Sequence, residues 1–196
     1  LAFGDIFMVF NNQKKGLDTV TDYHRNLDIT EATTTTSYTQ DGTTFKRETF
    51  SSYPDDVTVT HLTKKGNKTL DFTLWNSLTE DLLANGNYSW EYSYYKNGHV
   101  TTDANGILLK GIVKDNGLKF ASYLGIKTDG TVTVQNETLT VTGASYATLY
   151  LSAKTNFAQN PKTNYRKDID LEKTVKGIVE AAKAKDYETL KKAHIK

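Results

Sequence analysis

The sequence predicts a mainly β protein, an antiparallel β-sandwich followed by a short helical segment near the C-terminal end. Its 196 residues are enough for one sizeable hydrophobic core. Threonine is frequent, and 12 tyrosines and 8 phenylalanines accompany it, which favours strands because β-branched and aromatic side chains suit a pleated surface. Apolar and polar residues alternate in several runs, and this alternation gives way to a helical period late in the chain.

Alternation of apolar and polar residues marks the expected strands. The runs are Tyr23, Leu27 and Ile29, interrupted by Arg25; Leu70, Phe72 and Leu74; and Ala147, Leu149, Leu151 and Ala153. Because successive side chains of a strand point to opposite faces, each run predicts a strand with one apolar and one solvated face. Turn sequences that accept a positive φ separate the runs, namely Asp41-Gly42, Lys65-Gly66-Asn67, Asn97-Gly98, Asn116-Gly117 and Asp129-Gly130. Their spacing predicts a meander of antiparallel strands.

The pattern changes after a loop at residues 156–167, where Pro161 and several Asn and Lys residues end the alternation. Asp170 is expected to cap a helix with one apolar stripe made of Leu171, Val175, Ile178 and Ala182. A second helix is expected after Asp186, with Leu190 and Ala193 on its apolar side. We therefore divide the chain into a β-sandwich domain at residues 1–157 and a loop and helical linker at residues 158–196. Helices this short are marginal in water, so their stripes must pack against other apolar surface.

Composition excludes several classes of protein. The chain has no cysteine, and its 24 basic and 23 acidic residues leave a formal charge of +1. Nucleic acid is not an expected partner, because phosphate binding needs a concentrated basic surface. No membrane span is expected, since no apolar run approaches the roughly 18 residues that one requires. The first ten residues contain neither a basic leader nor a starting Met, so we expect an internal segment of a longer protein, with a processed mature chain as the alternative.

No motif in the sequence carries catalytic chemistry by itself. The histidines are far apart and have no second metal ligand nearby, and neither a nucleophile elbow nor a glycine-rich phosphate loop is present. We expect His24 and His61 to be structural. Paired carboxylates deserve attention because glycosidic hydrolysis uses two of them, but Asp55-Asp56 and Glu80-Asp81 are better explained as a turn and a helix start. Asp103-Ala104-Asn105-Gly106 has a slight likeness to a calcium-binding loop, but it lacks the remaining ligands and the closing Glu, so we expect a turn. We therefore predict no catalytic residue, no metal and no cofactor.

An aromatic segment is the other candidate for function. Residues 88–95 would place four rings on one face of a strand, those of Tyr88, Trp90, Tyr92 and Tyr94. Such a face could bind the apolar side of a sugar, and we take these four residues as candidate substrate-binding residues. The alternatives are a face packed on a neighbouring domain and an ordinary aromatic core.

Several sequence segments, taken in order, resemble the N-terminal domain of glycoside hydrolase family 95, the α-L-fucosidase family. They are residues 1–6 (LAFGDI), 23–29 (YHRNLDI) and 45–55 (FKRETFSSYPD), followed by the segments 147–157 and 186–194. The resemblance implies a β-supersandwich, then a helical linker, then a catalytic (α/α)6 barrel in the same polypeptide. It also implies that the parent is an inverting hydrolase of terminal α-L-fucose or a related sugar. The catalytic groups of the family belong to the barrel, so no catalytic residue is carried over to this chain.

Our leading hypothesis is a non-catalytic N-terminal accessory domain that braces the barrel of a fucosidase-type hydrolase, whose partners are that barrel and, through the parent, carbohydrate. The rival hypothesis is an independent carbohydrate-binding or adhesion module of a bacterial surface protein. The expected location is extracellular or on the surface of a bacterium, with the cytoplasm as the alternative. An exposed aromatic strip at residues 88–95 would favour the rival, whereas an apolar face near the helices would favour the brace.

Overall fold

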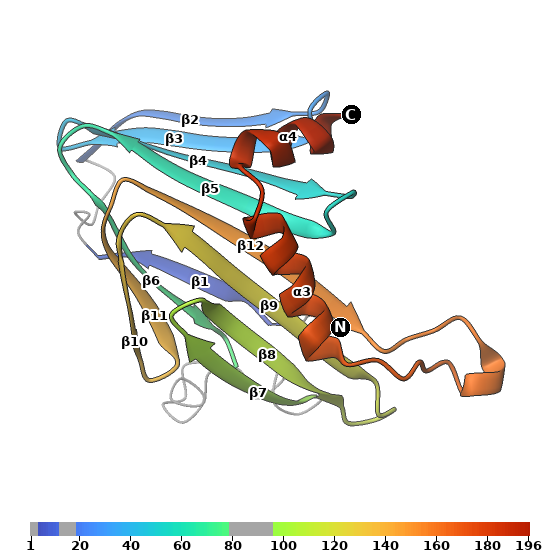
Figure 1. Ribbon diagram of the computed structural model, residues 1–196. Coiled ribbons are helices and arrows are strands. Elements are labelled where there is room, and N and C mark those ends of the chain that lie inside the picture. The colour runs from blue at the N-terminus through green and yellow to red at the C-terminus, as the bar shows by residue number, and fades with distance from the viewer. Residues whose placement is uncertain (1–3, 12–18, 79–95) are drawn as a thin grey trace.

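The computed structural model describes residues 4–11, 19–78 and 96–196. Within these residues the chain forms two antiparallel sheets that pack face to face, and two helices follow the last strand (Figure 1). The predicted fold class, mainly β and antiparallel with short helices near the C-terminal end, is confirmed.

The smaller sheet has the strand order β1-β6-β11-β10 and consists of β1 (Ile6–Phe10), β6 (Leu70–Asn76), β11 (Thr138–Ala144) and β10 (Thr131–Gln135). The larger sheet has the order β2-β3-β4-β5-β12-β9-β8-β7. Its strands are β2 (Val20–Asp28), β3 (Thr33–Gln40), β4 (Thr43–Ser52), β5 (Val57–Lys65), β12 (Tyr146–Thr155), β9 (Lys119–Thr128), β8 (Gly106–Val113) and β7 (Lys96–Asp103). A short 3-10 helix, η2 (Pro161–Thr163), precedes α3 (Leu171–Lys183) and α4 (Tyr187–Ile195).

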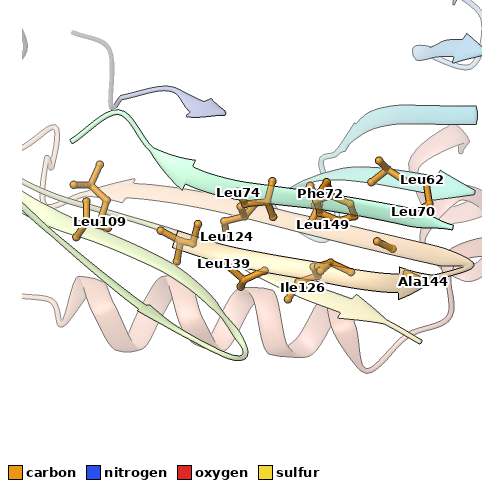
Figure 2. Packing of buried hydrophobic residues seen from close by; sticks show 14 of the residues in the cluster. Leu62, Leu70, Phe72, Leu74, Leu109, Leu124, Ile126, Leu139, Ala144 and Leu149 are labelled. Atoms are coloured by element: carbon orange, nitrogen blue, oxygen red, sulfur yellow. The ribbon is translucent and has the colours of Figure 1, made fainter. Parts of the chain in front are cut away.

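The main core lies between the two sheets (Figure 2). Leu70, Phe72 and Leu74 of β6 are fully buried there, so the alternation predicted a real core strand. They pack with inward residues of the larger sheet, among them Leu124 and Leu149. Burial of a row of apolar side chains from each sheet removes enough surface from water to hold the two layers together.

A second core lies on the outer face of the larger sheet, under the helices. Helix α3 crosses β9 and β12 and buries a stripe made of Leu171, Val175, Val179 and Ala182. The expected stripe is therefore correct at three positions, whereas Val179 takes the central place that we assigned to Ile178. Ile178 lies one position to the side and is only partly buried.

Close contact between helix and sheet depends on Gly125 of β9. A Cβ atom at this position would lie 2.5 Å from the Cγ1 atom of Val179. The absence of a side chain here lets α3 approach the backbone of the sheet. Gly177, on the outer side of the same helix, has open space around the corresponding position.

Three details of the predicted strands are wrong. The outer face of β12 is not solvated, because α3 covers it and Tyr150 and Ser152 are buried. The apolar residues of the first run, Tyr23 and Leu27 on β2 and Ile29 just beyond it, are exposed instead of packed, since β2 is an edge strand outside the smaller sheet.

The third error concerns a turn. Asn97-Gly98 lies within β7, paired with Ile112 and Gly111, and the hairpin between β7 and β8 turns after Asp103 instead. The Asp103 carboxylate accepts the N–H groups of Asn105 (2.7 Å) and Gly106 (3.1 Å), so this residue has the turn role that we assigned to it.

Replacing Gly125 with Ala is expected to destabilise the protein, because the new methyl group overlaps Val179 and forces helix and sheet apart. The expected loss of unfolding free energy is about 1–3 kcal/mol. Gly177→Ala is the matched control, and it should stabilise the protein by roughly 0.5–1 kcal/mol, since the helical site is open. Chemical denaturation of both variants measures the difference, and equal stabilities would contradict close packing at Gly125.

Candidate functional site

The most developed polar site among the described residues lies where α4 packs on the outer face of β4 and β5. Glu48 of β4 pairs with His61 of β5, and Phe50 pairs with Val59, so these side chains share one face of the sheet. Helix α4 is capped by Asp186, whose carboxylate accepts the N–H of Thr189 at 2.8 Å, and its start lies where the sequence predicted. Its buried residue Leu190 joins the second core.

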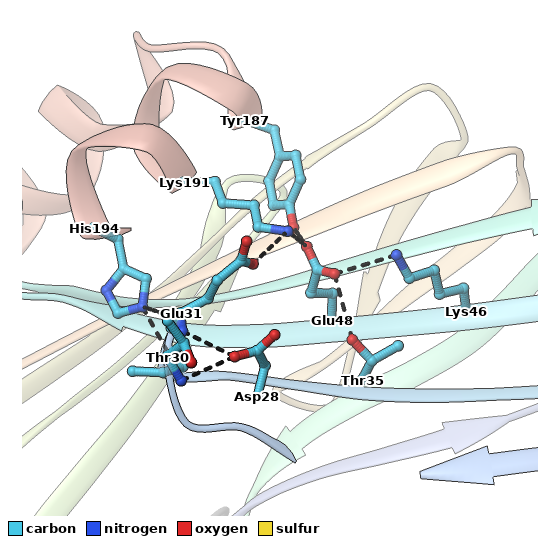
Figure 3. Close-up of polar contacts among 10 residues, drawn as sticks. Asp28, Thr30, Glu31, Thr35, Lys46, Glu48, Tyr187, Lys191 and His194 are labelled. Carbon is cyan, nitrogen blue, oxygen red and sulfur yellow. Dashed lines mark hydrogen bonds and ion pairs between the residues drawn. The ribbon is translucent and has the colours of Figure 1, made fainter. Parts of the chain in front are cut away.

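Glu48 is the centre of this site (Figure 3). Its carboxylate accepts hydrogen bonds from the Tyr187 hydroxyl, from Lys191 (3.0 Å) and Lys46 (3.2 Å), and from Thr35 (3.4 Å). Only 7% of the residue is exposed. Burial by itself raises the pKa of Glu48, but the hydrogen bonds from Tyr187, Lys191 and Lys46 outweigh it and lower the pKa to about 2. The carboxylate is therefore ionised at neutral pH and already saturated with donors.

Aromatic rings surround this carboxylate. The Tyr187 ring stacks on His61 with centroids 4.0 Å apart, and His194 stacks on Phe50 at 4.8 Å. His61 also shares a hydrogen bond of 2.7 Å with the Thr148 hydroxyl. Burial lowers the pKa of His61, so the ring is neutral at pH 7 and serves as a packed, hydrogen-bonded side chain, the role predicted for it.

The last turn of α4 is held by the turn that follows β2. The Asp28 carboxylate accepts the N–H groups of Thr30 (2.9 Å) and Glu31 (3.0 Å) and so fixes this turn. The carbonyl oxygen of Glu31 lies 2.9 Å from the Nε2 atom of His194 (Figure 3). A local turn in the N-terminal part of the chain thus receives the end of the C-terminal helix.

A second tether holds the junction between the helices. Lys185, between α3 and α4, donates a hydrogen bond to the Asp55 carboxylate, which also accepts the Ser52 hydroxyl at 2.6 Å. Burial raises the pKa of Asp55, but the bonds from Lys185 and Ser52 outweigh this effect, and the net pKa is lowered. We call Glu48, Asp55, Lys185, Tyr187 and Lys191 together the linker latch.

The linker latch is suited to holding the helices and not to chemistry. Its two carboxylates are ionised and occupied by donors, and Tyr187 has a raised pKa because of burial and the adjoining Glu48 carboxylate. No cluster of three or more potential metal ligands occurs in the described part of the chain. Over the same residues, no helix is long and apolar enough to cross a membrane.

The predicted substrate-binding residues Tyr88, Trp90, Tyr92 and Tyr94 lie outside the described residues, as does Glu80-Asp81, so these predictions stay open. Among the histidines, His24 is exposed on β2. Asp56 follows Asp55 in the turn before β5 and forms an ion pair with Lys154.

The linker latch was not predicted as a site. Arg47 and Glu48 are adjacent in the sequence, but their side chains point to opposite faces of β4. A signal did exist, because Lys46, Glu48 and Phe50 alternate on one face that also carries buried apolar residues. The pattern could not identify the partner of Glu48, because Tyr187 lies 139 residues away along the chain.

The fold and the anchored helices define an antiparallel β-sandwich domain whose C-terminal helices are fixed to its larger sheet. Among solved structures, the chain is similar to one assigned as a kojibiose phosphorylase from the human microbiome, with a TM-score of 0.64 at 12% sequence identity. This similarity covers 97% of the chain and 26% of that protein, so the chain spans about a quarter of its length. No curated protein sequence matches the chain.

A family model described as the N-terminal domain of glycosyl hydrolase family 65 matches residues 1–160. The chain therefore belongs to this family of N-terminal domains. The expectation of an N-terminal domain from a glycoside hydrolase is confirmed at this level.

Tyr187→Phe removes one donor from the Glu48 carboxylate and leaves its ring stack with His61 in place. We expect a loss of about 1–2 kcal/mol in unfolding free energy, because a buried charge loses a hydrogen bond. Tyr53→Phe is the matched control, since Tyr53 is 96% exposed, and it should change nothing measurable. Equal melting temperatures for the two variants would show that the hydrogen bond does not hold α4.

The stabilisation by Glu48 depends on pH in a defined direction. Its folded-state pKa of about 2 is lower than the ordinary 4.5, so its contribution is complete above pH 4.5 and is lost as pH falls toward 2. We expect Glu48→Gln to be less stable than the wild type by about 2 kcal/mol at pH 7. Urea denaturation between pH 7 and 2.5 should show the gap narrowing below pH 4.5, and a constant gap would contradict the ionised state.

Proposed function

We propose that the chain is the non-catalytic N-terminal domain of a fucosidase-type inverting glycoside hydrolase, and that it braces the catalytic (α/α)6 barrel of the same polypeptide. The linker latch is the observation that carries this proposal. A buried ionised carboxylate, a second tether at the helix junction and an apolar stripe fix both helices to the sheet. Helices fixed in this way can hold a following domain in one orientation.

The choice of a fucosidase-type parent is supported by the position of the segments that resemble family 95. Residues 45–55 supply Glu48, Phe50 and Asp55, and residues 186–194 supply Tyr187 and His194. These two segments, far apart in sequence, contact each other in the linker latch. The presence of both segments in one chain therefore has a physical reason. A substitution in one segment would leave a buried hydrogen-bonding group of the other without its partner.

The family 65 match gives a second candidate for the parent, an enzyme that cleaves an α-glucosidic disaccharide by phosphorolysis. The structural neighbour assigned as a kojibiose phosphorylase supports this alternative only through its fold, at 12% identity. The independent adhesion module is a weaker candidate, because a domain that acts alone gains little from two helices fixed by buried ion pairs.

The full-length polypeptide decides between the two enzymes. A fucosidase-type inverting hydrolase releases β-L-fucose from an aryl α-L-fucoside, which proton NMR detects at the anomeric signal. Cleavage of kojibiose that requires inorganic phosphate, without fucoside hydrolysis, would overturn the fucosidase proposal in favour of the second candidate.

The 196-residue chain alone is expected to hydrolyse no aryl α-L-fucoside. The one candidate carboxylate pair that the structure describes, Asp55-Asp56, is bound to Ser52, Lys185 and Lys154, and the buried Glu48 carboxylate is bound to its donors in the linker latch. Turnover by the purified chain that disappears when a residue within it is changed would contradict a non-catalytic role.

Bracing predicts a larger effect in the full-length enzyme than in the chain alone. Val179→Asp places an unpaired charge in a site that is fully buried and should cost about 2 kcal/mol or more. In the full-length enzyme we expect the barrel to inactivate at lower temperature while KM stays unchanged. Ile178→Asp, at the partly buried neighbouring position, should cost less. An unchanged inactivation temperature for Val179→Asp would remove the physical basis of the brace.

A further inference from the structure

A pocket of about 260 Å³ opens between the two sheets, on the face of the larger sheet opposite the linker latch. Residues of β1 and β6 in the smaller sheet line one side of this pocket, and residues of β4, β5, β9 and β12 in the larger sheet line the other. Its lining combines apolar side chains with a wall of polar ones. The apolar lining consists of Ile6, Met8, Leu74, Leu124, Leu149 and Leu151, and the polar lining of Arg47, Thr49, Thr58 and Thr60.

Arg47 is the one charged residue that lines the pocket. It is exposed, and within the described ranges its guanidinium has no hydrogen bond or ion pair with another side chain. Register places Arg25 on the same face, because Arg25 pairs with Thr36 and Thr36 pairs with Arg47. Among the paired residues of β2–β5 that share this face, none is acidic. Among these paired residues, the face therefore carries positive charge without an acidic partner.

The polar wall presents hydroxyl groups in fixed positions. Thr49 and Thr60 share a hydrogen bond of 3.0 Å between their hydroxyls, and Ser51 and Thr58 share one of 2.9 Å. Each of these hydroxyls keeps the capacity for a further bond, because a hydroxyl can donate once and accept twice. A ligand with several hydroxyl groups could therefore bond to this wall without breaking the existing pairs.

We propose that this pocket binds one pyranose ring that carries a carboxylate, the ring of a uronic acid. The volume lies below the roughly 300–1,000 Å³ of ordinary ligand pockets, which suits a single ring better than a chain of sugars. The C–H face of the ring packs on Met8 and Leu151, and its hydroxyls form hydrogen bonds with the threonines of the lining. The guanidinium of Arg47 donates hydrogen bonds to the carboxylate. The choice of a saccharide rests on the proposed function, whereas the anionic group follows from the unpaired arginine.

The test is titration of the 196-residue chain with galacturonate and with galactose, followed by calorimetry or NMR. The carboxylate of the first probe is its main difference from the second. We expect weak binding of galacturonate and at least about tenfold weaker binding of galactose, since a tenfold change corresponds to one charge-assisted hydrogen bond.

Variants assign the site. Arg47→Met keeps the aliphatic stem and removes the charge, and it should weaken galacturonate binding about tenfold or more. Arg166→Met removes the charge of a partly buried arginine that does not line the pocket, and it should have no effect. Thr60→Val keeps the shape and removes one hydroxyl, so a loss of a few fold is expected. Circular dichroism and thermal melting of each variant show that it remains folded.

Several results would overturn the proposal. Absence of galacturonate binding, equal binding of galactose, or equal binding of acetate would each exclude a site for an acidic sugar, the last because it would show a simple anion site. An equal loss in Arg47→Met and Arg166→Met would show non-specific attraction to positive charge. Fucoside hydrolysis by the full-length polypeptide is measured separately, so failure of the pocket and failure of the proposed function can be told apart.

Discussion

The structure depends on keeping one carboxylate ionised where water barely reaches. Glu48 sits beneath α4, and an unpaired charge in such a site would cost far more than a single hydrogen bond returns. Four donors from β3, β4 and α4 therefore have to converge on it. This requirement selects one position of α4 over neighbouring ones, because a shift by one turn would withdraw two of the donors together. Apolar contact alone would tolerate such a shift more easily, since it has no direction.

The remaining contacts of the helices favour the same position of α4. Asp55 holds the junction through Lys185, and the carbonyl of Glu31 meets His194 at the far end of α4. Helix α3 contributes four buried apolar residues where α4 contributes one, and Gly125 sets how closely α3 approaches the sheet. Packing thus supplies stability, and the polar contacts at the junction and along α4 supply position. The proposed brace depends on both, because holding a following domain in one orientation requires a stable and a fixed support.

Much of the fold could be predicted from local pattern, and the errors have one cause. Alternation identified β6 correctly, and the caps Asp170 and Asp186 start their helices as expected. Alternation predicted burial wrongly wherever burial depends on a segment distant in sequence. It predicted a solvated face for β12, which α3 covers, and a packed apolar face for β2, which nothing in the described chain covers. The turn predicted at Asn97-Gly98 was wrong for the same reason, because pairing with β8 outweighed the turn propensity of these residues.

The candidate site was harder to predict than the fold, because its residues come from opposite ends of the chain. The sequence singled out residues 45–55 and 186–194 only through a family resemblance, and it gave no indication that Glu48 and Tyr187 meet. A physical rule could have narrowed the search. A Glu on a strand face that is otherwise occupied by Phe50 and His61 needs donors, and a helix with Tyr and Lys four residues apart can supply two of them on one side.

The pleat of β4 explains how one short segment can serve two different purposes. Glu48 and Phe50 point toward the helices, whereas Arg47 and Thr49 point into the pocket between the sheets. Because side chains on opposite faces make no direct contact, their energetic effects should be nearly additive, with coupling below about 0.5 kcal/mol. The backbone of β4 connects the two faces, and it pairs with β3 on one side and with β5 on the other. Burial therefore constrains the residues of β4 that face the helices, whereas the residues that face the pocket can vary with the ligand. In this way one strand can keep its place in the fold and also contribute to ligand binding.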